Sequence, residues 1–410
     1  MAQAKLMRIL LLVAACLVGG VRAIYAQFTE TISRLYRPEI AALAMGEAVA
    51  AVPLPQTAFF YNPAHLIHVT GLKPSIVLIG VQGALSTNVF DQVAFVQDEL
   101  RPAIDEGLEN LTPEERRRLY EETLEKGRTR TTAALSLQLP TVSGRIGPVA
   151  AGGGVFLSSA GRYRTVESSS GVGIPRVEAD GRLDVLAVGT ASVQVQPGWS
   201  LGLSLKYLRR YLTHKHKSVE AFAPSEALLL LRGQAIGADV GVLYEPPLPG
   251  PGQLRLGLVL YNLVYTPLRY RYSRTLSGND GASQSALLAE EIVQANQYFG
   301  MRPGYRIGVA YTWRWQTPGG WLQAPTVSLD YIHQRDMRGG VLTRLSLGTR
   351  IAVGPVLSVA AGLHQGYTTA GLGLRLGGFR LAYALFGFEE GRLPGQLPSW
   401  QHTASLTISL

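Results

Sequence analysis

Residues 341–388 carry the pattern that most constrains the fold, because apolar side chains occupy every second position with few interruptions. Side chains on a β-strand point to opposite faces with period two, so the pattern predicts four consecutive strands joined by tight turns. One face is aliphatic, as in Leu345, Leu347, Ile351 and Val353. The other is small or polar and carries arginines. Such a pair of faces indicates a wall with lipid outside and water or a polar plug inside.

About fourteen strands follow Leu72. They are expected at 73–81, 128–139, 148–159, 182–196, 199–212, 230–245, 253–265, 304–316, 324–334, 341–353, 355–364, 368–376, 378–388 and 400–410. Long connections at 82–127, 160–181, 213–229 and 266–303 alternate with short Pro/Gly turns such as 141–147. Turns on one rim and long loops on the other are typical of outer-membrane barrels. We therefore predict an all-β fold, a transmembrane antiparallel β-barrel over residues 72–410.

Aromatic residues gather near the ends of these strands. Tyr305, Tyr311, Trp313 and Trp315 share one face of one predicted strand. Rings with an apolar body and a polar edge collect at membrane interfaces. A soluble β-sandwich would also alternate and pack aromatics, but the asymmetry of the connections and an N-terminal export signal favour the barrel.

Residues 1–26 have the features of a secretory signal peptide. Lys5 and Arg8 precede an apolar run, and Ala26 ends a small-residue cleavage site. Cys16 leaves a lipoprotein signal as the alternative. Cleavage after Ala26 would remove the one cysteine of the chain, which suits passage through an oxidising periplasm. The expected location is the outer membrane.

The formal charge of +9 comes from basic residues spread over strands and loops rather than clustered on one helix. This distribution favours contact with anionic outer-membrane lipid or anionic solutes over nucleic acid.

Two long loops are predicted to be helical. Thr112, Pro113 and Glu115 form the start signal of a helix, with a capping threonine, a proline at the first position and a glutamate at the third. A preceding helix is expected over 91–108, and another over 283–299. These helices either cap the mouth of the barrel or offer an apolar groove where a ligand lands.

The N-terminal region carries two motifs, Ala44-Met45-Gly46-Glu47-Ala48 and Phe59-Phe60-Tyr61-Asn62-Pro63-Ala64-His65-Leu66. Together they resemble the signature of the FadL-like outer-membrane barrels, a superfamily that includes PorV-like and TraF-like branches. The segments 362–373 and 389–391 are similar to the TraF-like and PorV-like branches. His65 replaces the usual glycine, and the chain ends in Leu410 where barrel-assembly signals usually end in an aromatic.

The resemblance implies an N-terminal hatch over residues 27–71 inside the barrel, shaped by Asn62 and Pro63. It also implies that a hydrophobic ligand would pass the aromatic motif when the hatch shifts. The candidate ligand-binding or hatch residues are Glu47, Phe59, Phe60, Tyr61, Asn62 and Pro63.

Arginines exceed acidic residues on the face that the alternation assigns to the lumen. The candidate lumen arginines are Arg306, Arg314, Arg344, Arg350, Arg375 and Arg380. A buried, unpaired charge is costly, so we expect Glu39, Glu47 and lumen aspartates to pair with them. These arginines either brace the plug or line a pathway for carboxylates, which guanidinium groups bind well.

No enzyme or metal site is expected. Residues 198–202 match G-x-S-x-G but open a strand with no following helix, so no nucleophile elbow can form. His214 and His216 lack an evident third metal ligand. No cofactor is implied. Two functions remain: passive transport of hydrophobic or amphipathic molecules, or a PorV-like scaffold that holds secretion-system or surface proteins.

Overall fold

The computed structural model describes residues 39–54, 58–69, 75–107, 110–127, 131–166, 176–218, 229–275, 292–293, 295–296, 303–315, 317, 321–334, 340–389, 395–396 and 398–410. The predicted signal peptide and most of the predicted 283–299 helix lie outside this range. The helical elements are α3 (Ile40–Ala44), η2 (Pro63–His68), α4 (Val89–Phe95), η3 (Val96–Leu100), α5 (Arg101–Glu106), α6 (Pro113–Gly127) and η5 (Val341–Arg344). The strands are β1 (Ser75–Ser86), β2 (Thr131–Gln138), β3 (Thr141–Ile146), β4 (Val149–Val166), β5 (Arg176–Gln196), β6 (Trp199–Ser218), β7 (Leu229–Tyr244), β8 (Gly252–Tyr265), β9 (Arg271–Thr275), β10 (Gly304–Trp313), β11 (Leu322–Gln334), β12 (Leu345–Val353), β13 (Leu357–His364), β14 (Tyr367–Leu376), β15 (Phe379–Glu389) and β16 (Pro398–Ser409).

The sixteen strands form one closed antiparallel sheet with fourteen positions around its wall. β1 pairs with β16 and closes the ring, so the sheet has no free edge there. β2 and β3 follow each other between β1 and β4, and β8 and β9 both pair with β7. Each of these two pairs is one wall strand with an interruption. The prediction of a fourteen-stranded barrel is confirmed.

One short turn was wrongly predicted. Residues 141–147 were expected to connect two strands, but Thr141–Ile146 is β3 and continues the line of β2 beyond Pro140. Proline has no N–H to give to the ladder, so it interrupts a strand without ending the wall.

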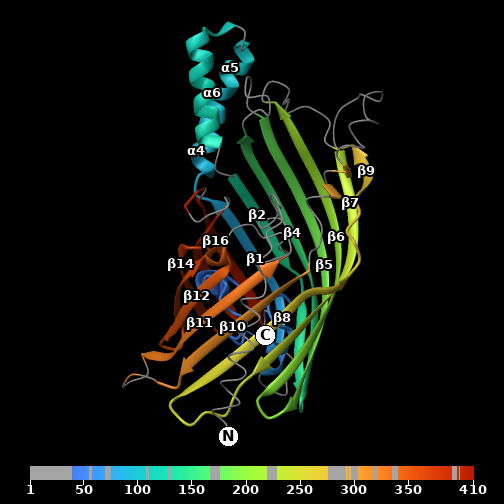
Figure 1. Cartoon of the computed structure of the whole chain (residues 1–410), viewed down its shortest axis with the longest axis vertical. Coiled ribbons are helices and arrows are strands. Elements are labelled where there is room, and N and C mark those ends of the chain that lie inside the picture. The colour runs from blue at the N-terminus through green and yellow to red at the C-terminus, as the bar shows by residue number, and fades with distance from the viewer. Residues whose placement is uncertain are drawn as a thin grey trace.

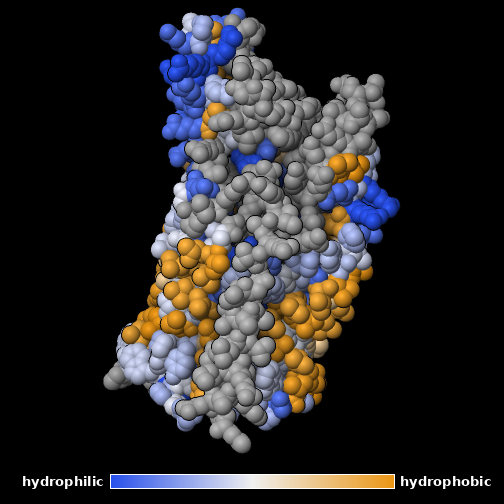
Figure 2. All heavy atoms as spheres, in the orientation of Figure 1, coloured by the Kyte–Doolittle hydropathy of each residue, from blue (hydrophilic) through white to orange (hydrophobic). Residues whose placement is uncertain are grey.

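The two faces of the wall are the ones that the alternation predicts. Leu347 is 42% exposed and points outward, whereas its neighbour Ser346 is 4% exposed and faces the lumen. On the face shown in Figure 2, hydrophobic side chains form a band across the coloured parts of the lower half of the molecule. Aromatic pairs lie at the short-turn rim, as with Trp199 and Tyr244, whose rings stack 4.2 Å apart.

The wall is much taller on one side than on the other. β4 to β7 rise as long, tilted strands, while β12 to β14 are short (Figure 1). β4 and β5 run well into the range 160–181 that was predicted to be a loop. Arg164 and Glu178 pair across these strands at 2.5 Å, and Arg162 pairs with Asp180, so charged residues occupy strand positions here.

The loop after β1 folds into helices that stand above the barrel as a narrow tower (Figure 1). α6 begins as predicted, because the Glu115 N–H donates to Thr112 Oγ1 at 3.2 Å and the Thr112 N–H donates to Glu115 Oε2 at 2.9 Å. The single helix predicted over 91–108 is found as three consecutive helical elements, α4, η3 and α5. Among the described residues, no helix is both long and apolar enough to cross a membrane.

Candidate functional site

Residues 39–54 and 58–69, called the hatch segment below, lie inside the barrel against the wall. Seven glycines of the wall, called the glycine belt below, lie so close to the hatch segment that an added Cβ atom would come within 3.0 Å of it. The glycine belt consists of Gly202, Gly241, Gly257, Gly308, Gly348, Gly362 and Gly371. Only glycine allows a strand to approach another backbone this closely.

Arg306 on β10 forms the centre of a polar cluster that holds the hatch segment. Its Nη1 donates to the Glu47 backbone carbonyl at 2.7 Å, and its Nη2 lies 3.5 Å from Glu47 Oε2. Asp330 on β11 lies 3.7 Å from Arg306 and accepts hydrogen bonds from the Val49 and Ala50 N–H groups, each at 2.8 Å. The three charged side chains are 95% buried or more, so a neighbour of opposite charge replaces the lost hydration of each.

The hatch segment makes a tight turn to reach this cluster. Gly46 and Glu47 both have positive φ, at +61° and +63°. A left-handed glutamate is uncommon, and its contacts with Arg306 stabilise it.

Three further wall side chains bind carbonyl oxygens of the hatch segment. Thr369 Oγ1 donates to Ala44 O at 2.7 Å, and Ser328 Oγ donates to Ala48 O at 2.6 Å. His364 Nδ1 lies 3.1 Å from Gly46 O. The backbone of the hatch segment therefore bonds to the wall much as a further strand would, although it is not part of the sheet.

Asn62 and Pro63 set the second turn of the hatch segment. Asn62 Oδ1 caps η2 by accepting from the Ala64 N–H at 3.0 Å, and Asn62 Nδ2 donates to Ala50 O at 2.8 Å. Pro63 occupies the first position of η2, where its missing N–H costs nothing. Asn62 thus joins two parts of the hatch segment that are distant in sequence.

His65 lies beneath this turn and is fully buried. Its Nε2 is 3.0 Å from Ala50 O, so this nitrogen donates, while Nδ1 has no hydrogen-bond partner among the described residues. Burial, together with the nearby His68 and Arg255, lowers the pKa of His65 to about 3. The imidazole is therefore neutral in the seated hatch segment.

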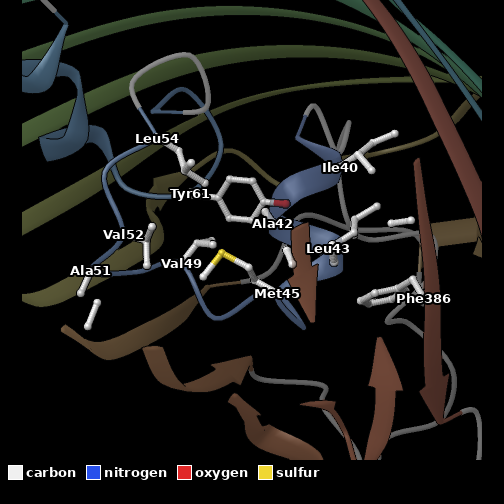
Figure 3. Packing of buried hydrophobic residues seen from close by; sticks show 14 of the residues in the cluster. Ile40, Ala42, Leu43, Met45, Val49, Ala51, Val52, Leu54, Tyr61 and Phe386 are labelled. Atoms are coloured by element: carbon white, nitrogen blue, oxygen red, sulfur yellow. The ribbon is translucent and has the colours of Figure 1, made fainter. Parts of the chain in front are cut away.

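Tyr61 anchors the apolar side of the hatch segment. Figure 3 shows Ala42, Met45 and Val49 gathered around its ring, with Phe386 approaching the same cluster from a wall strand. The Arg306 guanidinium lies 5.7 Å from the ring centroid of Tyr61, within cation–π range. The aromatic motif thus contacts both the apolar cluster and the polar one.

Phe59 and Phe60 face the other way, toward the tall wall. The Phe60 ring meets Phe156 edge-on at 4.7 Å, and the Phe59 ring lies 6.2 Å from it. Further buried apolar side chains surround Phe156, which together form the lumen apolar cluster: Phe59, Leu186, Val188, Leu208, Leu212, Leu231, Ala235, Leu268, Tyr270 and Ala295. Lumen faces of water-filled barrels are polar, so the lumen apolar cluster distinguishes this barrel from a water-filled pore.

The lumen apolar cluster was not predicted from the sequence. Leu208 and Leu212 have the same parity as Lys206 and Arg210, and so belong to the inward face of β6. A signal was present at Tyr207 and Leu208, where two apolar residues in succession break the alternation.

The charged lumen residues near this cluster are paired. Arg210 binds Asp184 through two hydrogen bonds of 2.6 and 2.8 Å, and Lys206 binds Asp239 at 2.6 Å. The pairing of Arg210 with Asp184 was also not predicted, although both lie in predicted strands, because the register between two strands cannot be read from either strand alone. Arg210 and Lys206 thus each already have a carboxylate partner.

The six arginines predicted in the lumen are found in different places. Arg306 lies in the polar cluster, and Arg380 lies 3.9 Å from Glu39, as expected for braced charges. Arg350, Arg375 and Arg380 line a cavity of about 620 Å³ on the short-turn side of the hatch segment. Glu39, Leu54 and Leu410 also line this cavity.

Two of the six are not in the lumen. Arg314 follows the end of β10 and is exposed, so it belongs to a rim turn. Arg344 lies in η5, and its Nη1 is 2.7 Å from His333 Nδ1 and 3.4 Å from Tyr331 Oη, on the outward face of β11. The helical turn of η5 breaks the period of two on which that prediction relied.

Within the described part of the chain, no three His, Cys, Asp or Glu side chains converge as a metal ion requires. The hatch segment, held by hydrogen bonds and ion pairs, instead separates the lumen apolar cluster from the arginine-lined cavity.

Comparison with models of known protein families finds no match for the sequence, and no curated protein matches it. Solved structures do match. A structure described as the TodX monoaromatic hydrocarbon channel deltaS2 mutant has a TM-score of 0.50 at 11% identity, over 93% of this chain and 99% of that chain. The CymD monoaromatic hydrocarbon channel has a TM-score of 0.48 at 12% identity, over 90% of this chain and 96% of that one. A Pseudomonas aeruginosa FadL homologue has a TM-score of 0.45 at 12% identity, over 92% and 98%.

The likeness to TodX extends over nearly the whole of both chains, including the closed wall of this chain. The resemblance expected from the two N-terminal motifs is thus confirmed for the fold. The chain has the fold of the FadL-like outer-membrane β-barrels.

Proposed function

We propose that this protein is a passive outer-membrane channel for neutral hydrophobic molecules. The observation that carries the proposal is the contact of Phe59 and Phe60 with Phe156, through which the hatch segment closes one end of the lumen apolar cluster. A solute in that cluster would leave water for apolar surroundings, and the hatch segment would have to shift before the solute could go further.

The pairing of charges favours a neutral solute over a carboxylate. Arg210 and Lys206 near the apolar cluster already bind Asp184 and Asp239. The description of TodX as a monoaromatic hydrocarbon channel supports the same solute class. The solute class expected from the sequence, hydrophobic or amphipathic molecules, is thereby narrowed to molecules without a formal charge.

The test is uptake into vesicles that carry the purified protein, with a radiolabelled monoaromatic hydrocarbon and a long-chain fatty acid as probes. We expect hydrocarbon uptake above that of empty vesicles. Ala235→Asp places a carboxylate in the lumen apolar cluster and should reduce uptake at least ten-fold, since burying an unpaired charge is unfavourable. Ala235→Asn adds a side chain of the same size at the same position without the charge and is the matched control. Hydrocarbon uptake equal to that of empty vesicles, with or without fatty-acid uptake, would overturn the proposal.

A second function is supported by the tower of α4 to α6. Phe90 is 73% exposed and Val93 is 48% exposed on α4, at the base of the tower (Figure 1). Exposed apolar side chains rimmed by charge mark protein contacts, which fits a PorV-like scaffold for secretion-system or surface proteins. Recovery of a stable protein partner that Phe90→Ser abolishes, without solute flux, would favour this function over transport.

A further inference from the structure

The wall has a second interruption, between β8 and β9, on the tall side of the barrel. β7 pairs with β8 up to Tyr265 and resumes with β9 at Arg271. Between them, Leu268 and Tyr270 turn inward and are buried in the lumen apolar cluster. Since side chains alternate, Arg269 and Arg271 point outward from the same segment, and both are exposed.

A cavity of about 370 Å³ lies on the outer surface at this interruption. Arg232, Arg269 and Arg271 line it, together with Gln234, Tyr207 and Ile236. Arg232 and Arg271 are directly opposed across β7 and β9. Like charges in direct opposition destabilise a sheet, and no carboxylate is among the residues that line the cavity. An anion from outside the chain would remove this repulsion.

The position of the cavity along the membrane normal indicates which kind of anion would bind there. On β6 the outward face is apolar from Leu201 to Tyr207 and becomes basic at Arg209, which lies over the Tyr211 ring at 5.3 Å. Trp199 marks the opposite border of this apolar stretch. The ten steps from Trp199 to Arg209 span roughly 33 Å along the strand, or about 25 Å along the membrane normal at the usual tilt. That is the height of the lipid-facing band of an outer-membrane barrel.

The cavity is thus at headgroup level on the long-loop side. Figure 2 shows a hydrophilic patch directly above the hydrophobic band, where Figure 1 places the ends of β7 and β9. Ile236 and Tyr207 line the membrane side of the cavity, and both are exposed. A lipid there would place acyl chains along apolar residues and its headgroup among arginines. Guanidinium groups bind phosphate through two parallel hydrogen bonds, which makes arginine well suited to this contact.

We propose that this cavity is a binding site for a phosphorylated membrane lipid of the leaflet on the long-loop side, with Arg232, Arg269 and Arg271 as the phosphate ligands. Bound lipid would neutralise the opposed arginines and fix the segment that carries Leu268 and Tyr270 into the lumen. The proposal does not depend on transport, because a barrel that moves no solute would still bind the lipid.

The experiment is native mass spectrometry of the full protein in detergent, titrated with a bis-phosphorylated lipid A and, separately, with its dephosphorylated form. We expect a one-to-one adduct with the phosphorylated lipid only. Replacement of Arg232, Arg269 and Arg271 by Gln should weaken that binding at least ten-fold. Replacement of Arg116, Arg117 and Arg118 by Gln removes the same charge from exposed positions of α6 and is the matched control.

Each remaining outcome decides against the site. Equal binding by the triple variant at β7 and β9, or equal binding of the dephosphorylated lipid, would overturn the proposal. Inorganic phosphate serves as a competitor; if millimolar phosphate displaced the lipid completely, the cavity would be a site for soluble anions rather than for lipid. Heat-modifiable migration on gels, which reports an intact barrel, ensures that lost binding is not lost folding.

Discussion

Arg306 and Glu47 are separated by 259 positions in the chain, yet the Arg306 guanidinium donates to the Glu47 backbone carbonyl at 2.7 Å inside the barrel. This contact joins the hatch segment to the wall between two buried charged side chains. Because each charge compensates for the hydration that the other has lost, removing one of them by a single substitution should strongly destabilise the seated hatch segment.

Arg306→Met should release the hatch segment. The substitution leaves the Glu47 and Asp330 carboxylates buried without their cation, a change that costs about 3–5 kcal/mol in buried pairs. We expect faster hydrogen–deuterium exchange over residues 39–54 and larger conductance in planar bilayers. Arg314→Met removes an exposed arginine just beyond the end of the same strand and should leave both unchanged. Identical exchange in the two variants would show that the polar cluster does not hold the segment.

The glycine belt makes a steric prediction. In Gly257→Ala the new methyl group would meet the Ala50 carbonyl and the Ala51 nitrogen, which are backbone atoms and cannot rotate away. Overpacking of this kind costs about 1–3 kcal/mol, so exchange over the hatch segment should accelerate while the barrel remains folded. Gly189→Ala on β5 has nothing within 4 Å and is the control. Slower exchange in Gly257→Ala than in the control would contradict the close approach.

His65 makes the seating of the hatch segment dependent on pH. Burial lowers its pKa to about 3, below the ordinary 6.5, so the seated state favours the neutral ring. Stability is therefore complete above about pH 6.5 and falls as the pH drops toward 3, by roughly 2 kcal/mol at pH 5 if release exposes the ring to water.

The measurement is exchange over residues 39–54 at pH 7.5 and pH 5, corrected for the intrinsic rate. Opening should increase at pH 5 in the wild type and much less in His65→Gln, which keeps an N–H donor but does not titrate. A pH response of equal size in both proteins would assign the effect to another group. Glu245 is an unlikely source, since its contacts with His68 and Arg255 outweigh its burial and lower its pKa to about 2.

The lipid-facing side of the wall can be tested by depth. Leu372 is 53% exposed and lies in the middle of β14, so Leu372→Arg should cost about 2–4 kcal/mol. Ile146 is 86% exposed at the end of β3, near the rim, and Ile146→Arg should cost no more than about 1 kcal/mol. Denaturant unfolding of the barrel in lipid vesicles measures both. Equal costs would place the membrane elsewhere on the wall.

The barrel follows from the sequence because period-two alternation is a local property. Leu345 to Val353 are assigned to the correct faces from neighbouring residues alone. The alternation fails where local structure breaks the period, as at η5, which carries Arg344 to the outside. It also fails where charged residues pair across strands, as Arg164 and Glu178 do, because no neighbour in sequence reveals the partner.

The site is less predictable than the wall. Asn62 and Pro63 reveal a turn, since capping is local. The wall partners of Glu47 and Val49 are Arg306 on β10 and Asp330 on β11, more than 250 positions away, and only the closed ring brings them together. Ser346 shows the same point: it faces the lumen as expected but lies 3.2 Å from His364, so an arginine there would have less room than alternation suggests.

The seam between β1 and β16 has a consequence for the order of biogenesis. The hatch segment is synthesised before every strand, and it contacts the inner faces of strands from β6 to β14 with no slack for a side chain at the glycine belt. A finished cylinder offers little clearance for threading such a peptide. We therefore expect the wall to form around the hatch segment, with β1 and β16 pairing only after that segment is enclosed.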